Sequence, residues 1–329
     1  MLIMAKFKIG IVGVGMVGAA LKRYFEEQGL KRNKTLFCFD TDPAKNCNDD
    51  VHKAELVFIS VPTPAKKDGS CDAGIVESEV KKLASSAKII VIKSTVEPGT
   101  TEYLAKKYNC ALVFSPEFLT EAKAWENMIN PDRQIVAPTA KAKAAASSIL
   151  HLLPPARFTS PKHKKAARWA ELNPTEAELG KYAANTFGAL KVSFANLVYD
   201  FAKMTEESIS KKGVKIKVDY NNIRHVLAED PRIGNSWLNV EYQHYRGYGG
   251  YCFPKDTEAI IAYGRRTVKK MPKSAKRRLL EKGVGLLEAM RSYNNAVLAS
   301  QGLTAENVSR HDEELLKIIK RFRKSRVKK

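Results

Sequence analysis

One cysteine stands where a thiol could carry out covalent chemistry. Cys252 follows the glycine-rich stretch Gly247-Tyr-Gly-Gly and is followed by Phe-Pro-Lys-Asp256. Pro254 and Asp256 are favoured in a first helical turn, so a helix is predicted to begin at this cysteine. A helix N-terminus and a neighbouring lysine, Lys255, favour the nucleophilic thiolate. We therefore predict a reactive cysteine, whose preceding glycines would let a substrate approach backbone N–H groups.

A polar pair lies on a predicted helix that is otherwise strongly apolar. Thr175 and Glu178 fit a capping box that starts a helix reaching about residue 210. Lys181 and Asn185 are four residues apart on this helix, so they share one face. Polar groups on so apolar a helix must be paired or functional, and a lysine there could stabilise a developing oxyanion. The alternative is a lysine whose aliphatic chain follows the apolar surface while its charge stays in water.

The first half of the chain predicts a dinucleotide site. Residues 7–12 form an apolar strand that leads into Gly13-Val-Gly15-Met-Val-Gly18 and a helix. In this context G-x-G-x-x-G permits a tight turn, a close approach of pyrophosphate, and packing of the helix on the strand. The next strand, residues 35–39, ends at Asp40, which suits the ribose hydroxyls and favours NAD over NADP. The alternative for Asp40 is a turn or cap residue.

Three further strands, residues 55–61, 87–92 and 111–114, also end in polar loops. Ligands of an open parallel sheet lie outside the carboxyl ends of its strands, so these loops predict one pocket. Its candidate residues are Thr63, Thr95, Glu117 and Glu121.

These patterns predict an α/β fold: a Rossmann-like, doubly wound sheet followed by an all-helical central domain. We expect one more strand at residues 130–137, a helix at 138–150 and a boundary region at 151–172. Later helices are expected at residues 219–227 and 278–299, with a short one from residue 311. The predicted domains are residues 1–174, 175–300 and a basic helical tail, 301–329. The apolar circumference of the helix at 179–209 predicts a homodimer interface or burial inside a domain.

The composition indicates a soluble protein with an unusual charge. The chain has 329 residues and a net charge of +21, with basic runs at residues 265–278 and 317–329. That charge would attract nucleotides or nucleic acid, although it also fits a solvated basic surface. No apolar run reaches the roughly 18 residues needed to span a bilayer, and no signal peptide is apparent. Five cysteines without framework spacing favour reduced thiols in the cytoplasm, and no metal site is predicted.

These motifs together resemble the UDP-glucose 6-dehydrogenase family of nucleotide-sugar dehydrogenases, from about Lys8 to Asn295. Further matching segments are Val61-Pro-Thr63-Pro, Lys93-Ser-Thr95, Ser115-Pro-Glu-Phe-Leu-Thr-Glu121, Pro131-Asp-Arg133 and Lys181-Tyr-Ala-Ala-Asn185. The resemblance implies oxidation of UDP-glucose to UDP-glucuronate by two hydride transfers to NAD, in support of polysaccharide biosynthesis. GDP-mannose or UDP-N-acetylmannosamine remain alternative substrates.

The resemblance also implies roles for individual residues. Cys252 would form a thiohemiacetal and then a thioester, and Lys181 and Asn185 would stabilise the oxyanion. Asp256 and Thr95 would hold a water and carry protons, while Glu121 would assist hydrolysis of the thioester. The implied NAD contacts are Gly13, Gly15, Val17, Gly18, Asp40, Lys45, Thr63, Thr95, Glu121 and Lys255. The implied substrate contacts are Glu117, Phe118, Leu119, Glu121, Lys181, Asn185, Arg232 and Gly249.

The resemblance is incomplete in the last part of the chain. The family carries a third, Rossmann-like domain over the substrate's nucleotide, whereas residues after Asn295 predict only basic helix. Residues 232–247 also form an extended loop carrying Tyr245 and Arg246, and residues 161–169 form a basic insertion. We therefore expect an open nucleotide pocket. The chain could be a fragment, a short form completed by another chain, or a catalytically impaired scaffold or binding protein.

Overall fold

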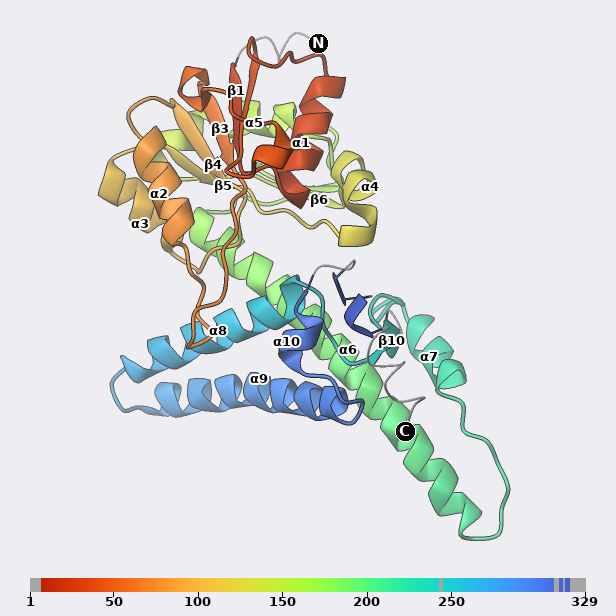
Figure 1. Cartoon of the computed structure of the whole chain (residues 1–329). Helices are drawn as coiled ribbons and strands as arrows, with labels where there is room; N and C mark the ends of the chain where they lie inside the picture. The colour runs from red at the N-terminus through yellow and green to blue at the C-terminus, as the bar shows by residue number, and fades with distance from the viewer. Residues whose placement is uncertain (1–6, 243–244, 311–313, 316, 320–329) are drawn as a thin grey trace. The chain divides into compact units, whose positions relative to one another are not determined.

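The computed structural model describes residues 7–242, 245–310, 314–315 and 317–319 (Figure 1). The chain folds into two compact units. The first unit comprises Met1–Lys66 and Cys71–Lys181, and the second comprises Lys67–Ser70 and Tyr182–Lys329. The division falls inside one long helix rather than at residue 174, because the first turns of that helix pack with the first unit.

The first unit is built on a six-stranded sheet with the order β2-β1-β3-β4-β5-β7. Its strands are β1 (Ile9–Val12), β2 (Leu36–Phe39), β3 (Leu56–Ile59), β4 (Ile89–Ile92), β5 (Leu112–Phe114) and β7 (Ala137–Pro138). All pairings are parallel except that of β7 with β5. Short strands buried along almost their whole length are typical of parallel sheets covered on both faces. The predicted Rossmann-like sheet is confirmed.

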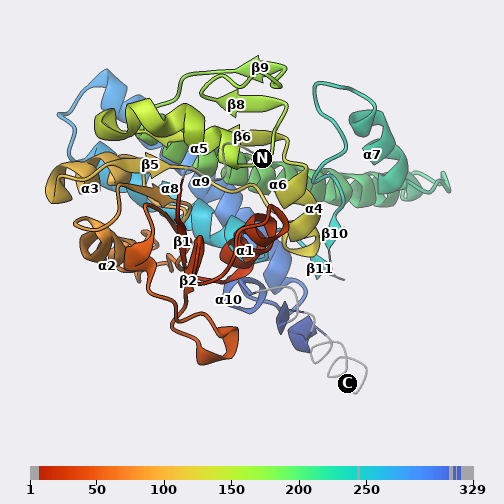
Figure 2. The same ribbon diagram turned by 90° about the horizontal axis from the view of Figure 1, so that it is seen from above.

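Helices cover both faces of this sheet (Figure 2). On one face lie α1 (Met16–Glu27), α4 (Ala124–Ile129) and α5 (Ala146–Leu152); on the other lie α2 (Gly74–Leu83) and α3 (Thr100–Tyr108). Alternate residues of each strand supply the two cores, so that Ile9 and Ile11 face α1 while Val12 faces the opposite side. The short 3-10 helices are η2 (Pro43–Lys45), η3 (Val51–Lys53), η4 (Glu121–Lys123) and η5 (Ala140–Ala145).

Residues 130–172 differ from the prediction. The single strand expected at 130–137 is two strands, β6 (Arg133–Ile135) and β7, which belong to different sheets. Between them Val136 donates its N–H to the Ser160 carbonyl, which holds the chain at the change of sheet. The expected boundary region instead supplies β8 (Phe158–Ser160) and β9 (Arg168–Trp169), and both pair within the first unit. Strands of two or three residues are too short to leave a periodic pattern.

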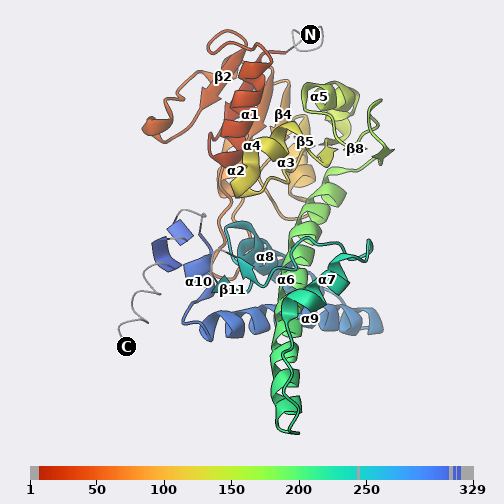
Figure 3. The ribbon, with the colours of Figure 1, turned by 90° about the vertical axis from the view of Figure 1, so that its right-hand side faces the viewer.

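The second unit is mainly helical, as predicted. It contains most of α6 (Pro174–Ser210), then α7 (Tyr220–Ala228), α8 (Cys252–Lys269), α9 (Ala275–Ala299) and α10 (Ala305–Val308). Helices α8 and α9 pack along each other (Figures 1 and 3). Helix α7 packs on α6 through Tyr220 and Ala195. The antiparallel pair of β10 (Glu241–Tyr242) and β11 (Tyr245–Arg246) was not predicted. The short helix expected from residue 311 lies partly outside the described residues.

The start of α6 corrects the predicted capping box. Asn173 and Glu176, rather than Thr175 and Glu178, form the reciprocal pair of hydrogen bonds, each 2.9 Å long. Pro174 then occupies the first helical position, where its missing N–H costs nothing. Glu178 is fully buried and points to a different helix terminus, described below.

Candidate functional site

The glycine-rich turn between β1 and α1 has the geometry of a pyrophosphate cradle. Gly13 has a φ of 84°, and a methyl group on Gly18 would lie 1.9 Å from the Gly13 carbonyl oxygen. The space beside the Gly15 α-carbon is open, and no side chain among the described residues caps α1. The exposed N–H groups of a helix start bind anions, so this turn fits the pyrophosphate of a dinucleotide.

Asp40 closes the same turn from the end of β2. Its carboxylate accepts hydrogen bonds from the Val14 N–H at 2.5 Å and the Asp42 N–H at 2.9 Å. Asp40 therefore organises the glycine turn as well as lying where a ribose is expected. Of the other predicted NAD contacts in this unit, Thr63 is buried, Val17 is half-buried and Lys45 is exposed. Their contacts with NAD stay predictions.

Two lysines and one glutamate meet at the carboxyl ends of β4 and β5. We call Lys93, Ser115, Glu117 and Lys181 the lysine cluster. The Lys181 ammonium donates to the Glu117 carbonyl oxygen at 2.6 Å and to Glu117 Oε1 at 3.1 Å. Lys93 donates to Ser115 Oγ at 3.2 Å and to the Pro116 carbonyl oxygen at 3.4 Å. Lys181 is only 3% exposed, so it is not the solvent-facing lysine of the alternative interpretation.

Burial dominates the electrostatics of the lysine cluster. It lowers the pKa of Lys93 to about 8, against the opposing attraction of the Glu117 carboxylate, and Lys181 lowers it further. The second oxygen of Glu117 accepts the Leu119 N–H at 2.6 Å, so the carboxylate is held from both sides. A carboxylate fixed between an ammonium group and a backbone N–H keeps its loop in one conformation.

Phe118 lies between two cations. The Arg133 guanidinium is 3.7 Å from the centre of its ring, and the Lys181 ammonium is 5.1 Å from it. Burial lowers the pKa of Arg133. Such stacking is attractive and fixes the ring and the cations together. Phe118 therefore belongs to the same constellation as Glu117 and Lys181, and its contact with a substrate stays a prediction.

Glu178 links α6 to the start of α3. Its carboxylate accepts the Gly99 N–H at 2.6 Å and the Thr101 N–H at 2.8 Å, and thus caps that helix. Burial raises the pKa of Glu178 to about 7, although these hydrogen bonds lower it. Because Glu178 precedes Lys181 by one helical turn, the cap fixes the part of α6 that carries the lysine.

The second unit contains the predicted cysteine motif. Cys252 is the first residue of α8, as predicted, and it is half-buried while the other four cysteines are buried. One turn later Asp256 is 1% exposed. Its carboxylate accepts a hydrogen bond from Asn185 Nδ2 at 2.5 Å and pairs with the Lys255 ammonium at 2.5 Å. Asn185 and Lys255 therefore both reach the buried carboxylate.

The remaining predicted residues have different surroundings. Thr95 is half-buried, and its carbonyl accepts from the Cys71 thiol at 3.6 Å. Glu121 is half-buried at the start of η4. The side chain of Arg232 is 87% exposed and pairs with Asp230 at 2.6 Å. A methyl group on Gly249 would clash with Tyr245 and Val308, and a contact of its backbone with a substrate stays a prediction.

Lys93 and Arg133 were not given roles from the sequence, and Glu178 was given only that of a cap at the start of its own helix. A lysine directly after the apolar run Ile89-Ile-Val-Ile was a usable signal, because a charge there must be buried or at a site. Glu178 carried no such signal, since its partners are about 77 residues away in the chain. Among the described residues, no cluster of three potential ligands could hold a metal ion, and no helix could cross a bilayer.

Two models of one protein family match the chain. The NAD binding domain of the UDP-glucose/GDP-mannose dehydrogenase family matches residues 32–152, and its central domain matches residues 175–278. Cys252 lies inside the second match, whereas the glycine turn precedes the first. The match to an NAD binding domain and the open turn at Gly15 agree on NAD as the cofactor.

Individual relatives agree with the family models. The chain is 33% identical to the UDP-glucose 6-dehydrogenase of Pseudomonas aeruginosa over 222 residues, which is 63% of this chain and 44% of the relative. It is also 33% identical to UDP-glucose 6-dehydrogenase YwqF of Bacillus subtilis over 220 residues, 64% and 44% of the two chains. The structure of a UDP-glucose dehydrogenase from Pyrobaculum islandicum aligns with a TM-score of 0.67 and 26% identity, over 87% of this chain and 67% of that one. The chain spans between 44% and 58% of the length of the curated UDP-glucose 6-dehydrogenases that it matches here.

Proposed function

This chain belongs to the UDP-glucose/GDP-mannose dehydrogenase family, and on that premise we propose that it oxidises UDP-glucose to UDP-glucuronate. The reaction removes four electrons from a primary alcohol. When bound, NAD accepts a hydride in each of two successive oxidations. The remaining steps depend on residues of the chain, and both constellations described above supply them.

In the proposed reaction Cys252 holds the substrate covalently between the two oxidations. Loss of a hydride and a proton from the primary alcohol gives an aldehyde, to which the Cys252 thiolate adds. The product of that addition is the thiohemiacetal anion, and loss of a second hydride from it gives a thioester. Water then cleaves the thioester to a carboxylate, the thiol and a proton. The thiolate is the natural tether at neutral pH, because it is nucleophilic and also a good leaving group from a thioester.

Lys181 and Asn185 are proposed to stabilise the negative oxygen that forms when the thiolate adds. An ammonium has three N–H donors, and Glu117 accepts from two of them in Lys181, which leaves one direction for a substrate oxygen. A preoriented donor in a buried site is worth more than in water. Lys181 and Asn185 lie one turn apart on α6, so one helix carries both.

Asp256, Thr95 and Glu121 are proposed to handle protons. Asp256 accepts from two donors, as an ionised carboxylate does, and could receive a proton from a bound water. Thr95 would hold that water, and Glu121 would assist hydrolysis. Glu117, Phe118 and Leu119 would line the sugar pocket beside Lys181.

One observation carries the proposal: the partly exposed Cys252 at the first residue of α8, with the buried Asp256 one turn later. A helix N-terminus stabilises the thiolate, which the reaction requires. A cysteine with a purely structural role is usually fully buried, as the other four cysteines are.

The test is single-turnover mixing of the full chain with UDP-glucose and NAD. We expect two NADH per UDP-glucose and a mass-shifted Cys252 peptide, both lost in Cys252→Ser. If only GDP-mannose or only UDP-N-acetylmannosamine gave NADH, that nucleotide sugar would replace UDP-glucose as the proposed substrate. The proposed reaction steps would then stay the same. NAD binding without any NADH from the three substrates would overturn the activity and support a scaffold or binding role.

We also propose that two copies of the chain pair through α6. Phe187, Phe194 and Phe201 recur every seven residues on this helix and are 58%, 51% and 52% exposed, and Met204 is 58% exposed. Apolar residues at this spacing form one face of a helix, and the same face of a second copy is self-complementary about a twofold axis. Such a large exposed apolar stripe is uncommon on a monomer.

The oligomeric state tests this pairing. Light scattering coupled to size exclusion should give a dimer for the natural chain and a monomer for Phe194→Glu. Val226→Glu is the matched control, because Val226 is 76% exposed but lies on α7. A monomeric natural chain, or a Phe194→Glu variant that still dimerises, would contradict the proposal.

A further inference from the structure

The turn before Cys252 is packed tightly by the protein itself. Gly247 and Gly250 adopt left-handed φ angles of 96° and 73°. A methyl group on Gly247 would lie 2.9 Å from Asn294 Oδ1, and one on Gly249 would lie 2.8 Å from the Val308 Cβ atom. Gly247 and Gly249 therefore have no room for a side chain, because the surrounding protein approaches their α-carbons closely.

The backbone of the same turn is hydrogen-bonded at several residues. Asn294 of α9 is 2% exposed; its Oδ1 accepts the Tyr248 N–H at 2.7 Å and its Nδ2 donates to the Tyr248 carbonyl at 3.2 Å. The Gly250 N–H donates to the Val308 carbonyl of α10 at 2.8 Å. These bonds fix the turn to α9 and α10, but they do not reach α6.

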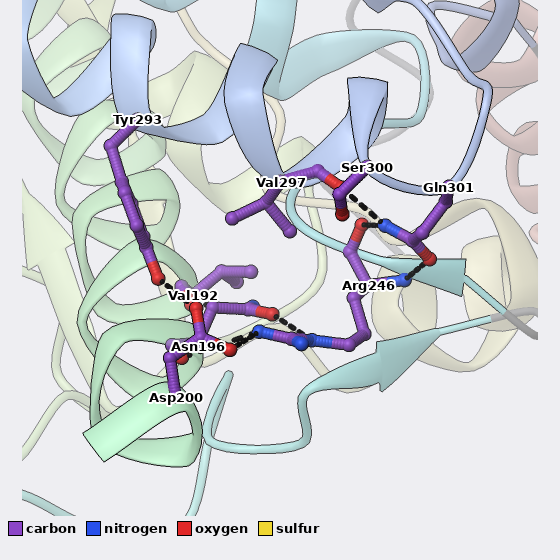
Figure 4. A network of polar contacts seen from close by, with 8 residues as sticks. All are labelled: Val192, Asn196, Asp200, Arg246, Tyr293, Val297, Ser300 and Gln301. Carbon is purple, nitrogen blue, oxygen red and sulfur yellow. Dashed lines mark hydrogen bonds and ion pairs between the residues drawn. The ribbon is translucent and has the colours of Figure 1, made fainter. Parts of the chain in front are cut away.

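Arg246 makes polar contacts with α6 (Figure 4), on which Tyr248 of the turn also packs through Ala189 and Val192. Its Nε donates to Asn196 Oδ1 at 3.0 Å and its Nη2 pairs with Asp200 Oδ1 at 2.6 Å. The guanidinium also lies 4.1 Å from the centre of the Tyr199 ring. Asn196 and Asp200 are one turn apart on α6, so the guanidinium spans both with its planar fork.

The partners of Arg246 are themselves held in place. Asn196 is 1% exposed, and its Nδ2 donates to the Val192 carbonyl at 2.9 Å, which orients the amide oxygen toward Arg246. The second oxygen of Asp200 accepts from the Tyr293 hydroxyl at 2.8 Å. The backbone of Arg246 pairs with the Gln301 amide through bonds of 2.8 and 3.0 Å. Figure 4 shows the contacts of Arg246 with Asn196, Asp200 and Gln301.

We propose that Arg246 is a positioning residue for the Cys252 thiol. It stands directly before the glycine turn and ties that turn to α6, while Asn294 of α9 and Val308 of α10 hold the turn from two other helices. This inference rests on the proposed function, in which Cys252 attacks the substrate aldehyde. Covalent attack requires the reacting atoms within a narrow range of distance and angle, and a misplacement of about 1 Å can cost about 100-fold in rate.

The experiment compares Arg246→Met with Arg246→Lys and with Arg277→Met. Arg277 is the matched control, because its guanidinium also has two partners, Glu281 and the Met271 carbonyl, but none in the turn. The first readout is the rate of Cys252 carbamidomethylation by iodoacetamide at pH 8, measured by peptide mass spectrometry. Amide hydrogen exchange of the peptide that contains residues 245–251 is the second readout, and kcat and KM the third.

We expect Arg246→Met to change the Cys252 alkylation rate by at least about threefold and to accelerate exchange of the turn peptide. Arg246→Lys should recover part of both effects, since it keeps the charge but not the fork. In active enzyme kcat should fall about 10- to 100-fold with little change in KM for NAD. Arg277→Met should match the natural chain in every readout.

Two results would overturn the inference. The first is that Arg246→Met leaves the alkylation rate and the exchange rate as in the natural chain. The second is that Arg277→Met changes both rates as much as Arg246→Met does, which would indicate general destabilisation. The alkylation and exchange readouts need no turnover, so they separate this inference from the proposed function. Changed alkylation in a chain that forms no NADH would reject the proposed reaction while preserving the role of Arg246 in holding the turn.

Discussion

The lysine cluster and the cysteine turn are held in place by different means. In the first unit, Lys93 and Ser115 directly follow the parallel strands β4 and β5, so the sheet brings them together. In the second unit the turn lies between a two-residue strand and a helix start, and side chains of α6 and α9 fix it. The lysine cluster is therefore positioned mainly by regular backbone pairing, whereas the cysteine turn is positioned by individual side chains.

The difference predicts where each region is vulnerable. A parallel sheet distributes its support over many backbone hydrogen bonds, so removal of one side chain leaves the positions of its neighbours nearly unchanged. The cysteine turn depends on a few polar side chains, and loss of one leaves buried groups without partners. Substitutions should therefore act on chemistry in the first region and on geometry in the second.

The largest effect is expected for Lys181→Met. Loss of the ammonium removes the proposed oxyanion donor, so kcat should fall about 100- to 1000-fold. Cys252 alkylation should stay as in the natural chain, because the turn does not depend on this lysine. Lys88→Met is the control, since Lys88 is an exposed partner of Glu55. A changed rate of Cys252 alkylation in Lys181→Met would show that the geometry of the cysteine turn also depends on the lysine cluster, which contradicts the difference between the two regions.

A smaller effect, on stability, is expected for Glu178→Gln. Burial raises the pKa of Glu178 to about 7 from 4.5, so the folded chain holds this proton more tightly than the unfolded chain. The contribution of Glu178 to stability is therefore complete below pH 4.5 and is lost as the pH rises to about 7. The predicted loss is on the order of 3 kcal/mol across that window, and Glu178→Gln should lack it.

Urea unfolding at a series of pH values measures this difference. Glu27→Gln is the control, because Glu27 is an exposed partner of Arg23 on α1 and should leave the pH dependence unchanged. Parallel pH profiles for the natural chain and Glu178→Gln would show that the buried carboxyl is not the cause.

The smallest effect is expected for Tyr293→Phe. It removes only the hydrogen bond from the tyrosine hydroxyl to Asp200, and Arg246 keeps its ion pair. The free energy of unfolding should fall by about 1 kcal/mol or less, and exchange of the turn peptide should rise slightly. Urea unfolding and hydrogen exchange check this; a loss larger than that of Arg246→Met would make Tyr293, not Arg246, the main support of the turn.

The strands, the glycine motif and the helix start at Cys252 could be predicted because each leaves a local pattern. Four apolar residues precede Lys93 and four precede Gly13, and each run indicates a buried strand. The sheet then fixes the position of the residue that follows each strand. The same reasoning placed Asp40 and Glu117 correctly at the ends of their strands.

The supports of these residues could not be predicted in the same way. Thr175 and Glu178 satisfied the spacing of a capping box, yet Asn173 caps α6 and Glu178 caps α3. The sequence pattern does not distinguish these outcomes, because the choice depends on a partner about 77 residues away. From the sequence, Arg246 is likewise only one basic residue in a loop. Its partners Asn196 and Asp200 lie on α6, 50 and 46 residues earlier in the chain.

The edge strand β7 has a consequence for association through the sheet. An uncovered edge of a parallel sheet offers a row of N–H and C=O groups to any passing extended chain, a common route to aggregation. Here β7 runs against β5 for only two residues, and Pro138 has no N–H to donate to a further strand. We infer that this short, proline-bearing strand ends the sheet on that side and blocks edge-to-edge stacking of copies.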